Sequence, residues 1–187
     1  MTQSPDRVRW TTEDLELLPE NGNRYEIIDG SLLMTRAPHW KYQAVIAQAC
    51  NLLNPWSFTS NLGRAIPNPG IVFDDEDNVI PDAIWISQNR LVTGVNEEGH
   101  FTIAPELIIE VLSPGTQNER RDRELKLKLY AERGVQEYWI LDWRIQQLEI
   151  YTRQNARLKL GLTLLAPDRL TSSLLPGSSC LVSEFFL

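Results

Sequence analysis

The stretch ELIIEVL, residues 106–112, is the clearest strand signal in the chain, because it is mostly apolar and rich in β-branched residues. Ser113-Pro114-Gly115 ends it. Residues 119–133 then have the apolar spacing of a helix, Gly134 stands at the position of its C-terminal cap, and residues 136–141 form a second apolar strand. A strand, a helix and a strand in this order predict two parallel strands joined by a right-handed crossover.

The segments on both sides of this unit extend the predicted sheet. Asp29-Gly30 is a hairpin turn between apolar runs, and Pro38 begins an amphipathic helix that we expect to end at Pro55. Residues 88–102 are predicted to be an exposed connection, and the apolar tail 172–187 is expected to pack on the body of the protein. The other predicted elements are a short helix capped by Thr11 and Asp14, the hairpin 24–28 with 31–35, strands 64–66, 71–73 and 79–87, and the hairpin 148–152 with 158–164 across Asn155.

The whole pattern predicts an α/β (α+β) fold, a mixed β-sheet flanked by helices. A length of 187 residues, with 42% hydrophobic and 23% charged residues, favours one folded domain over residues 1–187, in which 1–22 form an N-terminal helical extension. No apolar run is long enough to span a membrane, and the first residues lack the apolar core of a signal peptide. We therefore expect a soluble, cytoplasmic protein without a membrane partner.

Charge is distributed unevenly along the chain, whose net charge is −7. Residues 1–118 hold 7 basic and 16 acidic side chains, a net of −9, whereas residues 119–169 hold 11 basic and 8 acidic side chains, a net of +3. The total argues mildly against nucleic-acid binding through bulk electrostatics. A polyanion would have to meet the second half, or reach the first half through metal ions.

The cysteine and histidine content excludes two classes of small stabilised domain. Two Cys are too few for a disulfide framework, and Cys50 and Cys180 lie too far apart in sequence for the paired spacing of a structural zinc site. Cys50 lies within the apolar pattern of a helix and is predicted to be a buried thiol, whereas Cys180 is uninformative.

Glu110 is the residue that fits a purely structural role least well. On a strand it shares one face with Ile108 and Leu112, so its carboxylate has apolar neighbours. Burying an ionised carboxylate without a partner is costly, so Glu110 must meet a cation, hydrogen-bond donors or water. The simpler interpretations are a salt bridge or a strand end that reaches solvent.

Asp82 and Lys126 are the two other candidates for chemistry. Asp82 follows Pro81, which cannot donate to a β-ladder and so marks an edge or bulge, although an acidic residue is also common in an ordinary turn. Lys126 forms a helical row with Asp122 and Tyr130 beside the inward-facing leucines, so its ammonium could reach the sheet. The alternative is an Asp122–Lys126 surface pair worth a few tenths of a kcal/mol.

Two carboxylates on adjacent strands and a lysine are the minimum needed for metal-assisted phosphodiester hydrolysis. Carboxylate and carbonyl oxygens are the hard ligands that Mg²⁺ prefers. The ion lowers the pKa of water and neutralises phosphate charge, while a lysine stabilises the developing charge.

These residues, in this order, resemble the PD-(D/E)XK nuclease superfamily, which has the restriction-endonuclease-like fold. The chain is most similar to the putative restriction endonuclease family that is expanded in cyanobacteria, from about residue 23 to its end. The matching stretches are RYEIIDG (24–30), Pro38-His39, Pro81-Asp82, EVLSP (110–114), Lys126 four residues before Tyr130, GVQEYWILD (134–142), LPG (175–177) and Phe185-Phe186.

The resemblance implies Asp82, Glu110 and the backbone carbonyl of Val111 as ligands of Mg²⁺ or Mn²⁺. It also shows one departure from the superfamily pattern, because the lysine expected two positions after Glu110 is Leu112. In this family the basic role moves to the following helix, which here means Lys126.

Three further residues are accessory candidates by the same resemblance. Glu26 could add an acidic group near the metal, His39 could approach the cleft, and Tyr130 follows Lys126 by one turn. A hairpin salt bridge for Glu26 and a hydrogen bond at the helix end for His39 are equally good structural alternatives.

The function implied is a Mg²⁺-dependent DNA endonuclease that uses water as nucleophile, with catalytic residues Asp82, Glu110 and Lys126. A catalytically inactive nuclease-like module that binds DNA or a protein is the alternative, since fold does not dictate function. An unrelated α/β domain with a chance motif is a third interpretation. The basic side chains placed to hold DNA phosphates are Arg120, Arg121, Arg123 and Lys128, diluted by neighbouring acids. Cleavage of both strands would need two sites, which predicts a two-fold homodimer.

Overall fold

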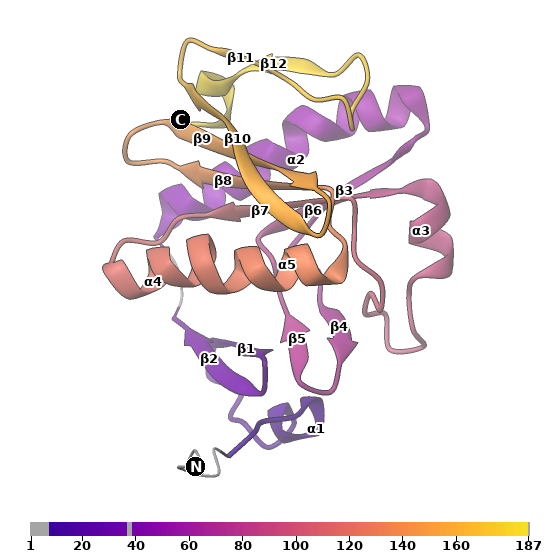
Figure 1. Ribbon diagram of the computed structural model, residues 1–187, viewed down its shortest axis with the longest axis vertical. Coiled ribbons are helices and arrows are strands. Elements are labelled where there is room, and N and C mark those ends of the chain that lie inside the picture. Colours follow the sequence, from indigo (N-terminus) through magenta and orange to yellow (C-terminus); the bar gives the residue numbers. More distant parts are fainter. Residues whose placement is uncertain (1–7, 37–38, 187) are drawn as a thin grey trace.

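The computed structural model describes residues 8–36 and 39–186. Its centre is a six-stranded mixed sheet with the strand order β10-β9-β8-β7-β6-β3 (Figure 1). The strands are β3 (Gly63–Pro67), β6 (Ala83–Ser87), β7 (Leu107–Val111), β8 (Glu137–Asp142), β9 (Gln147–Gln154) and β10 (Arg157–Leu165). The predicted mixed sheet flanked by helices is confirmed.

The strand–helix–strand unit that we predicted forms the middle of this sheet. Strands β7 and β8 are parallel, whereas every other neighbouring pair in the sheet is antiparallel. The connecting helix begins earlier than expected, at Thr116, and has three parts: α4 (Thr116–Arg120), a π-helical segment η1 (Arg121–Lys126) and α5 (Leu127–Arg133). Gly134 ends it in the left-handed conformation, with φ of 93°, as its cap position predicted.

Alternation along β7 divides the apolar core into two layers. Leu107, Ile109 and Val111 pack with α2 (Trp40–Ser60), whereas Ile108 and Leu112 pack with α5. Figure 1 shows the two helices on opposite faces of the sheet. The face that carries Ile108 also carries Glu110, which is therefore directed toward α5.

Helix α2 contradicts the prediction that Pro55 ends it. The predicted start at Pro38 lies outside the described residues; α2 has His39 as N-cap and continues through Pro55 to Ser60. Beyond the proline, the buried Ser57 hydroxyl accepts the indole N–H of Trp85 at 2.9 Å and donates to the Leu53 carbonyl at 2.8 Å. Packing against the sheet thus outweighs the backbone hydrogen bond that a proline removes. Cys50 is buried in this helix, as predicted.

A second, four-stranded sheet lies below the α4–α5 helix in Figure 1. Its order is β2-β1-β5-β4, from β1 (Arg24–Ile28), β2 (Ser31–Thr35), β4 (Ile71–Asp74) and β5 (Asp77–Val79). Asp29 and Gly30 join β1 to β2 with φ of 49° and 64°, as a type I′ turn requires. The short helix α1 (Thr12–Leu15) precedes this sheet, and the Thr11 N–H donates to the Asp14 carboxylate at 2.8 Å.

The predicted single strand 79–87 is wrong, because β5 and β6 belong to different sheets. The chain changes sheets across Ile80, Pro81 and Asp82. Pro81 has no N–H for a ladder, and the Ile80 N–H donates instead to the Glu26 carboxylate at 3.0 Å. The proline therefore does re-aim the chain, and it places Asp82 at the junction of the two sheets.

The remaining segments cover the ends of the main sheet. The connection predicted for 88–102 contains a short helix, α3 (Gln88–Thr93). After β11 (Arg169–Thr171), the C-terminal tail forms β12 (Ser179–Leu181) and the 3-10 helix η2 (Val182–Phe185). It buries Leu175, Val182 and Phe185 against the core, as predicted. Within the described ranges, no helix combines the length and the apolar character needed to cross a membrane.

Candidate active site

Asp82 and Glu110 meet where β6 and β7 run side by side. Ala83 pairs with Ile109, so Asp82, one residue before β6, lies beside Glu110. One Asp82 carboxylate oxygen, Oδ2, accepts the Val111 N–H at 2.8 Å. Asp82 is 0% exposed and Glu110 is 2% exposed. The structure therefore places the two predicted acids in the interior at neighbouring backbone positions.

Lys126 joins Glu110 to the smaller sheet. Its Nζ lies 2.8 Å from Glu110 Oε1 and 3.0 Å from Glu26 Oε1. The Tyr130 hydroxyl donates to the same Glu110 oxygen at 2.8 Å. Of the residues that the resemblance placed near the metal site, Lys126 and Tyr130 therefore contact Glu110 directly, and Glu26 contacts Lys126.

The position of Lys126 differs from the expected border of the helix. Asp122, Lys126 and Tyr130 are all buried, whereas Leu125 is only partly so. The π-helical segment changes the register of the helix, and such segments occur often at functional sites. The alternative of an Asp122–Lys126 surface pair is wrong, because neither side chain reaches the surface.

Arg24 and Tyr42 complete the cluster, and our reading of the sequence did not identify either as a site residue. The Tyr42 hydroxyl lies 2.6 Å from both oxygens of Asp82, and Arg24 Nη1 lies 3.0 Å from Oδ1. A weak signal was present, since Tyr42 places a hydroxyl on the apolar stripe of α2 and so needs a buried partner. Arg24 is the first residue of a matching stretch, but nothing in its neighbours indicates Asp82.

His39 lies elsewhere. Its ring stacks between Trp40 and Trp143, at centroid distances of 5.8 and 5.3 Å. Its Nδ1 accepts the Lys41 N–H at 3.1 Å, the helix-end hydrogen bond that was the structural alternative. The structure therefore does not place His39 among the carboxylates.

Burial and like charge decide the protonation of the carboxylates around Lys126. Burial raises the pKa of Glu110 to about 7, and the neighbouring Asp82 and Glu26 charges add to this against the opposing effect of Lys126. Burial would also raise the pKa of Glu26, but the Lys126 ammonium and the Ile80 N–H bring it below its ordinary value. Despite burial, these acids raise the pKa of Lys126, so it stays charged.

Asp122 gives a prediction about pH and stability. Burial raises its pKa from 3.8 to about 6, because the folded chain disfavours the ionised form. Between these values the folded state binds more protons than the unfolded state, so this group lowers stability as pH rises from about 4 to about 6. Asp122→Asn should remove that loss, about 2 to 3 kcal/mol from the size of the shift.

The measurement is urea unfolding of wild type and Asp122→Asn at several pH values from 4 to 7. The variant should gain stability relative to wild type across the interval from pH 4 to 6, and then keep a constant difference. Parallel curves for the two proteins would contradict the raised pKa.

The four predicted DNA-binding side chains differ in their ion pairing and in their exposure to solvent. Arg120 pairs with Glu124, and Arg123 pairs with Glu119 and Glu149. Arg121 is mostly buried between Asp122 and Thr35, whereas Lys128 is exposed, with a long contact of 3.7 Å to Glu132. A cavity of about 480 Å³ lies beside them, and its lining includes Arg120, Arg121, Lys128 and Leu33 of β2.

The cluster can be tested for its fit to a divalent ion. In the part of the chain that the structure describes, no three metal-binding side chains surround a common point. Mg²⁺ commonly takes only one or two protein carboxylates and keeps several waters, so Asp82 and Glu110 with a neighbouring carbonyl suffice. Glu26, Asp82 and Glu110 face two cations, Arg24 and Lys126, which leaves one surplus negative charge if all are ionised. Glu110 Oε2 accepts no hydrogen bond from the described residues. The chemistry of these oxygens therefore suits such an ion, with Glu110 Oε2 as the open ligand, whereas both Asp82 oxygens already accept hydrogen bonds.

The architecture is similar to that of a solved protein. A solved structure from Anabaena variabilis ATCC 29413, titled a putative nuclease belonging to DUF820, is similar to this chain with a TM-score of 0.74 and 21% sequence identity. The similarity covers 94% of this chain and 97% of that chain. A comparison with curated protein sequences finds no match.

A family model described as "Putative restriction endonuclease" (Uma2) matches residues 12–183. The chain therefore belongs to the Uma2 family, and the resemblance drawn from the sequence is confirmed. The family and the fold are consistent with the PD-(D/E)XK superfamily.

Proposed function

We propose that this protein hydrolyses phosphodiester bonds of DNA at Asp82 and Glu110, with a divalent cation and a water nucleophile. The observation that carries the proposal is the position of these two buried acids next to each other, Asp82 just before β6 and Glu110 on β7, with the Lys126 ammonium on Glu110. Membership of a family described as "Putative restriction endonuclease" supports the same reaction class.

Each side chain has a role that follows from its contacts. Tyr42 and the Val111 N–H hold the Asp82 carboxylate, and Tyr130 holds Glu110. Lys126 stays protonated and lies between the carboxylates, so it can donate to a phosphate oxygen on which negative charge develops. Lys126 would thereby perform the role of the lysine that the superfamily pattern has at the position of Leu112.

Mg²⁺ or Mn²⁺, bound by Asp82, Glu110 and the Val111 carbonyl, would supply Lewis acidity and lower the pKa of the attacking water. Substrate would approach along the cavity beside Arg120, Arg121 and Lys128, whose charges attract phosphates. Because nearby acids pair with most of these cations, DNA affinity should be weak and should fall steeply with salt.

The first test is plasmid cleavage by the purified chain. We expect supercoiled DNA to be nicked with Mg²⁺ or Mn²⁺ and to stay intact in EDTA, with activity restored when the ion is added back. The assay should be run at low ionic strength, since phosphate contacts weaken with salt. Cleavage that persists in EDTA would exclude the divalent-ion mechanism, and intact DNA under every condition would exclude the nuclease.

A nuclease-like module that binds DNA or a protein without cutting is the second candidate. The observation that favours this candidate is the burial of the cluster from solvent. The side chains of Glu26, Asp82, Glu110 and Lys126 are each at most 2% exposed. Gel-shift binding of DNA by a chain that does not cleave it would support this candidate.

We also propose a two-fold dimer for cleavage of both strands, because one such cluster can cut one strand at a time. Sedimentation velocity with and without a DNA duplex tests this, and a monomer in both conditions would contradict it.

A further inference from the structure

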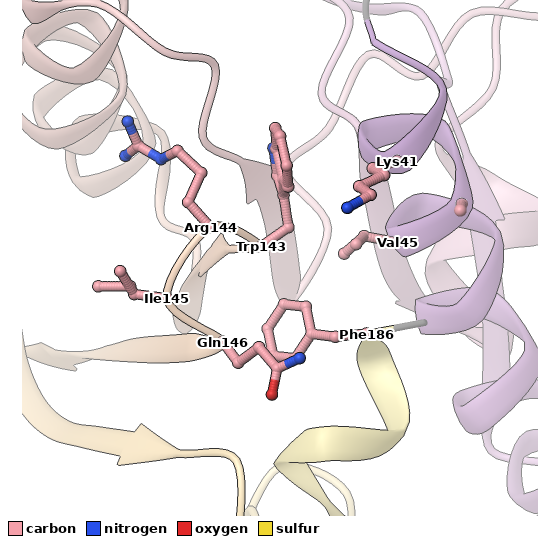
Figure 2. Close-up of a pocket in the computed structure, with 8 residues that line it drawn as sticks. Lys41, Val45, Trp143, Arg144, Ile145, Gln146 and Phe186 are labelled. Atoms are coloured by element: carbon pink, nitrogen blue, oxygen red, sulfur yellow. The ribbon is translucent and has the colours of Figure 1, made fainter.

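A cavity that none of the proposed chemistry uses lies at the N-terminal end of α2. Its volume is about 380 Å³, and its lining includes Lys41, Trp143, Gln146 and Phe186. Figure 2 shows Lys41 and Val45 of α2 on one side of the space and Trp143 and Gln146 of the β8–β9 turn on the other, with Phe186 next to them.

Trp143, which lines this cavity, is the last of three stacked aromatic rings. Trp40, His39 and Trp143 follow one another, with interplanar angles of 29° between the first two and 17° between the last two. Trp40 is 63% exposed although it is a large apolar side chain. An exposed, nearly parallel stack of this kind presents a flat π surface to solvent at the edge of the cavity.

A cation and an unused donor accompany the stack. Lys41 Nζ lies 5.8 Å from the ring centroids of both Trp40 and Trp143, and it forms no ion pair with the described residues. The Trp143 indole nitrogen is buried, yet among the described residues it has no hydrogen-bond partner. Since buried polar groups are nearly always paired, this unpaired N–H beside the cavity is a feature that packing within the described residues does not explain.

The cavity adjoins the carboxylate cluster through consecutive residues of one helix. Lys41 faces the cavity, and the next residue, Tyr42, bonds to Asp82. The same turn of α2 therefore borders the cavity and holds Asp82.

We propose that this cavity, with the Trp40–His39–Trp143 stack and Lys41, binds an unpaired nucleobase of single-stranded DNA. Aromatic platforms beside a cation are the recurring means of binding single strands, because every base has a π face. A base in a duplex cannot enter a cavity of this size while it remains paired and stacked. The proposal rests on the proposed function only in taking DNA as the nucleic acid, and it predicts a preference for unpaired over fully paired substrates.

The test is fluorescence anisotropy of a short labelled oligo-dT strand with the full chain in EDTA, where cleavage does not interfere. Wild type should bind the single strand more tightly than a duplex of the same length. Trp40→Ala and Trp143→Ala should each weaken binding by about tenfold, since a base–aromatic stack is worth about 1–3 kcal/mol. Trp143→Phe should retain most of the affinity, and Lys41→Gln should lower the salt dependence by about 0.7 in log–log slope.

Phe58→Ala is the matched control. Phe58 is 61% exposed on the same helix, and the Arg64 guanidinium lies 4.5 Å from its ring centroid, so it is an aromatic–cation pair of equal exposure away from the cavity. It should bind like wild type.

Equal affinity of Trp40→Ala and Phe58→Ala, tighter binding of the duplex, tighter binding of oligo-U RNA, or no binding of any oligonucleotide would each overturn the proposal. If oligo-dT binds as expected but plasmid is never cleaved, the nuclease proposal fails and this one stands. If plasmid is cleaved but oligo-dT does not bind, this proposal fails and the nuclease proposal stands.

Discussion

Glu110→Gln is expected to lower divalent-dependent DNA cleavage by roughly 100- to 1,000-fold, because metal-assisted charge stabilisation is worth several kcal/mol and each 1.36 kcal/mol is tenfold in rate. The substitution removes the negative charge that a cation would need while it keeps the size of the side chain. Its amide oxygen can still accept from Lys126 and Tyr130, which contact one oxygen of Glu110 in wild type. The measurement is the rate of plasmid nicking at saturating Mg²⁺.

The folded state should tolerate this change. Burial has already raised the pKa of Glu110 to about 7, so its charge is disfavoured in the folded protein and its loss costs little near neutral pH. The control is Glu132→Gln, an exposed acid of α5, which should leave both cleavage and the unfolding midpoint unchanged. Cleavage by Glu110→Gln at the wild-type rate would remove Glu110 from the mechanism.

Lys126→Met should lower the free energy of unfolding by about 3–5 kcal/mol at neutral pH, as is typical when one partner of a buried ion pair is removed. Lys126 is the cation that pairs with both Glu26 and Glu110. In the variant, these two buried acids would face each other without a cation. Without the ammonium their pKa values rise, and a raised carboxylate pKa costs stability as pH rises through it. The loss should therefore be smaller at pH 5 than at pH 8, which urea unfolding at both pH values measures.

Two further variants separate this charge effect from a loss of packing. Lys128→Met changes an exposed lysine two residues away and should alter stability by no more than about 0.5 kcal/mol. Adding Glu26→Gln to Lys126→Met should recover part of the stability, because one uncompensated acid is removed. A loss that is independent of pH, with no recovery in the double variant, would mean that Lys126 acts through packing alone.

The site was predictable where local pattern carried the information. Alternation along β7 placed Glu110 on the face of Ile108, and the break at Pro81 marked the place where the chain turns between sheets. The helical row of Asp122, Lys126 and Tyr130 followed from spacing alone. The burial of this row could not be predicted from spacing. It depends on the π-helical segment, and no simple pattern of residues indicates such a segment.

Errors arose where long-range contacts outweighed local propensity. Pro55 would end an isolated helix, but the buried Ser57–Trp85 hydrogen bond and the sheet beneath hold α2 to Ser60. Residues 79–87 have an apolar pattern like that of one strand, yet they are divided between two sheets. Strand pairing depends on partners far away in the chain, which local periodicity does not contain.

The order of strands and helix along the chain was enough to predict a mixed sheet with a parallel pair and to indicate Asp82 and Glu110, because burial periodicity and backbone chemistry are local properties. The folded chain alone shows that Arg24 and Tyr42 hold Asp82, that Lys126 bridges Glu26 and Glu110, and that His39 joins an aromatic stack instead. These contacts connect segments that are distant in sequence, and a buried charge selects its partners by distance and desolvation in the folded chain.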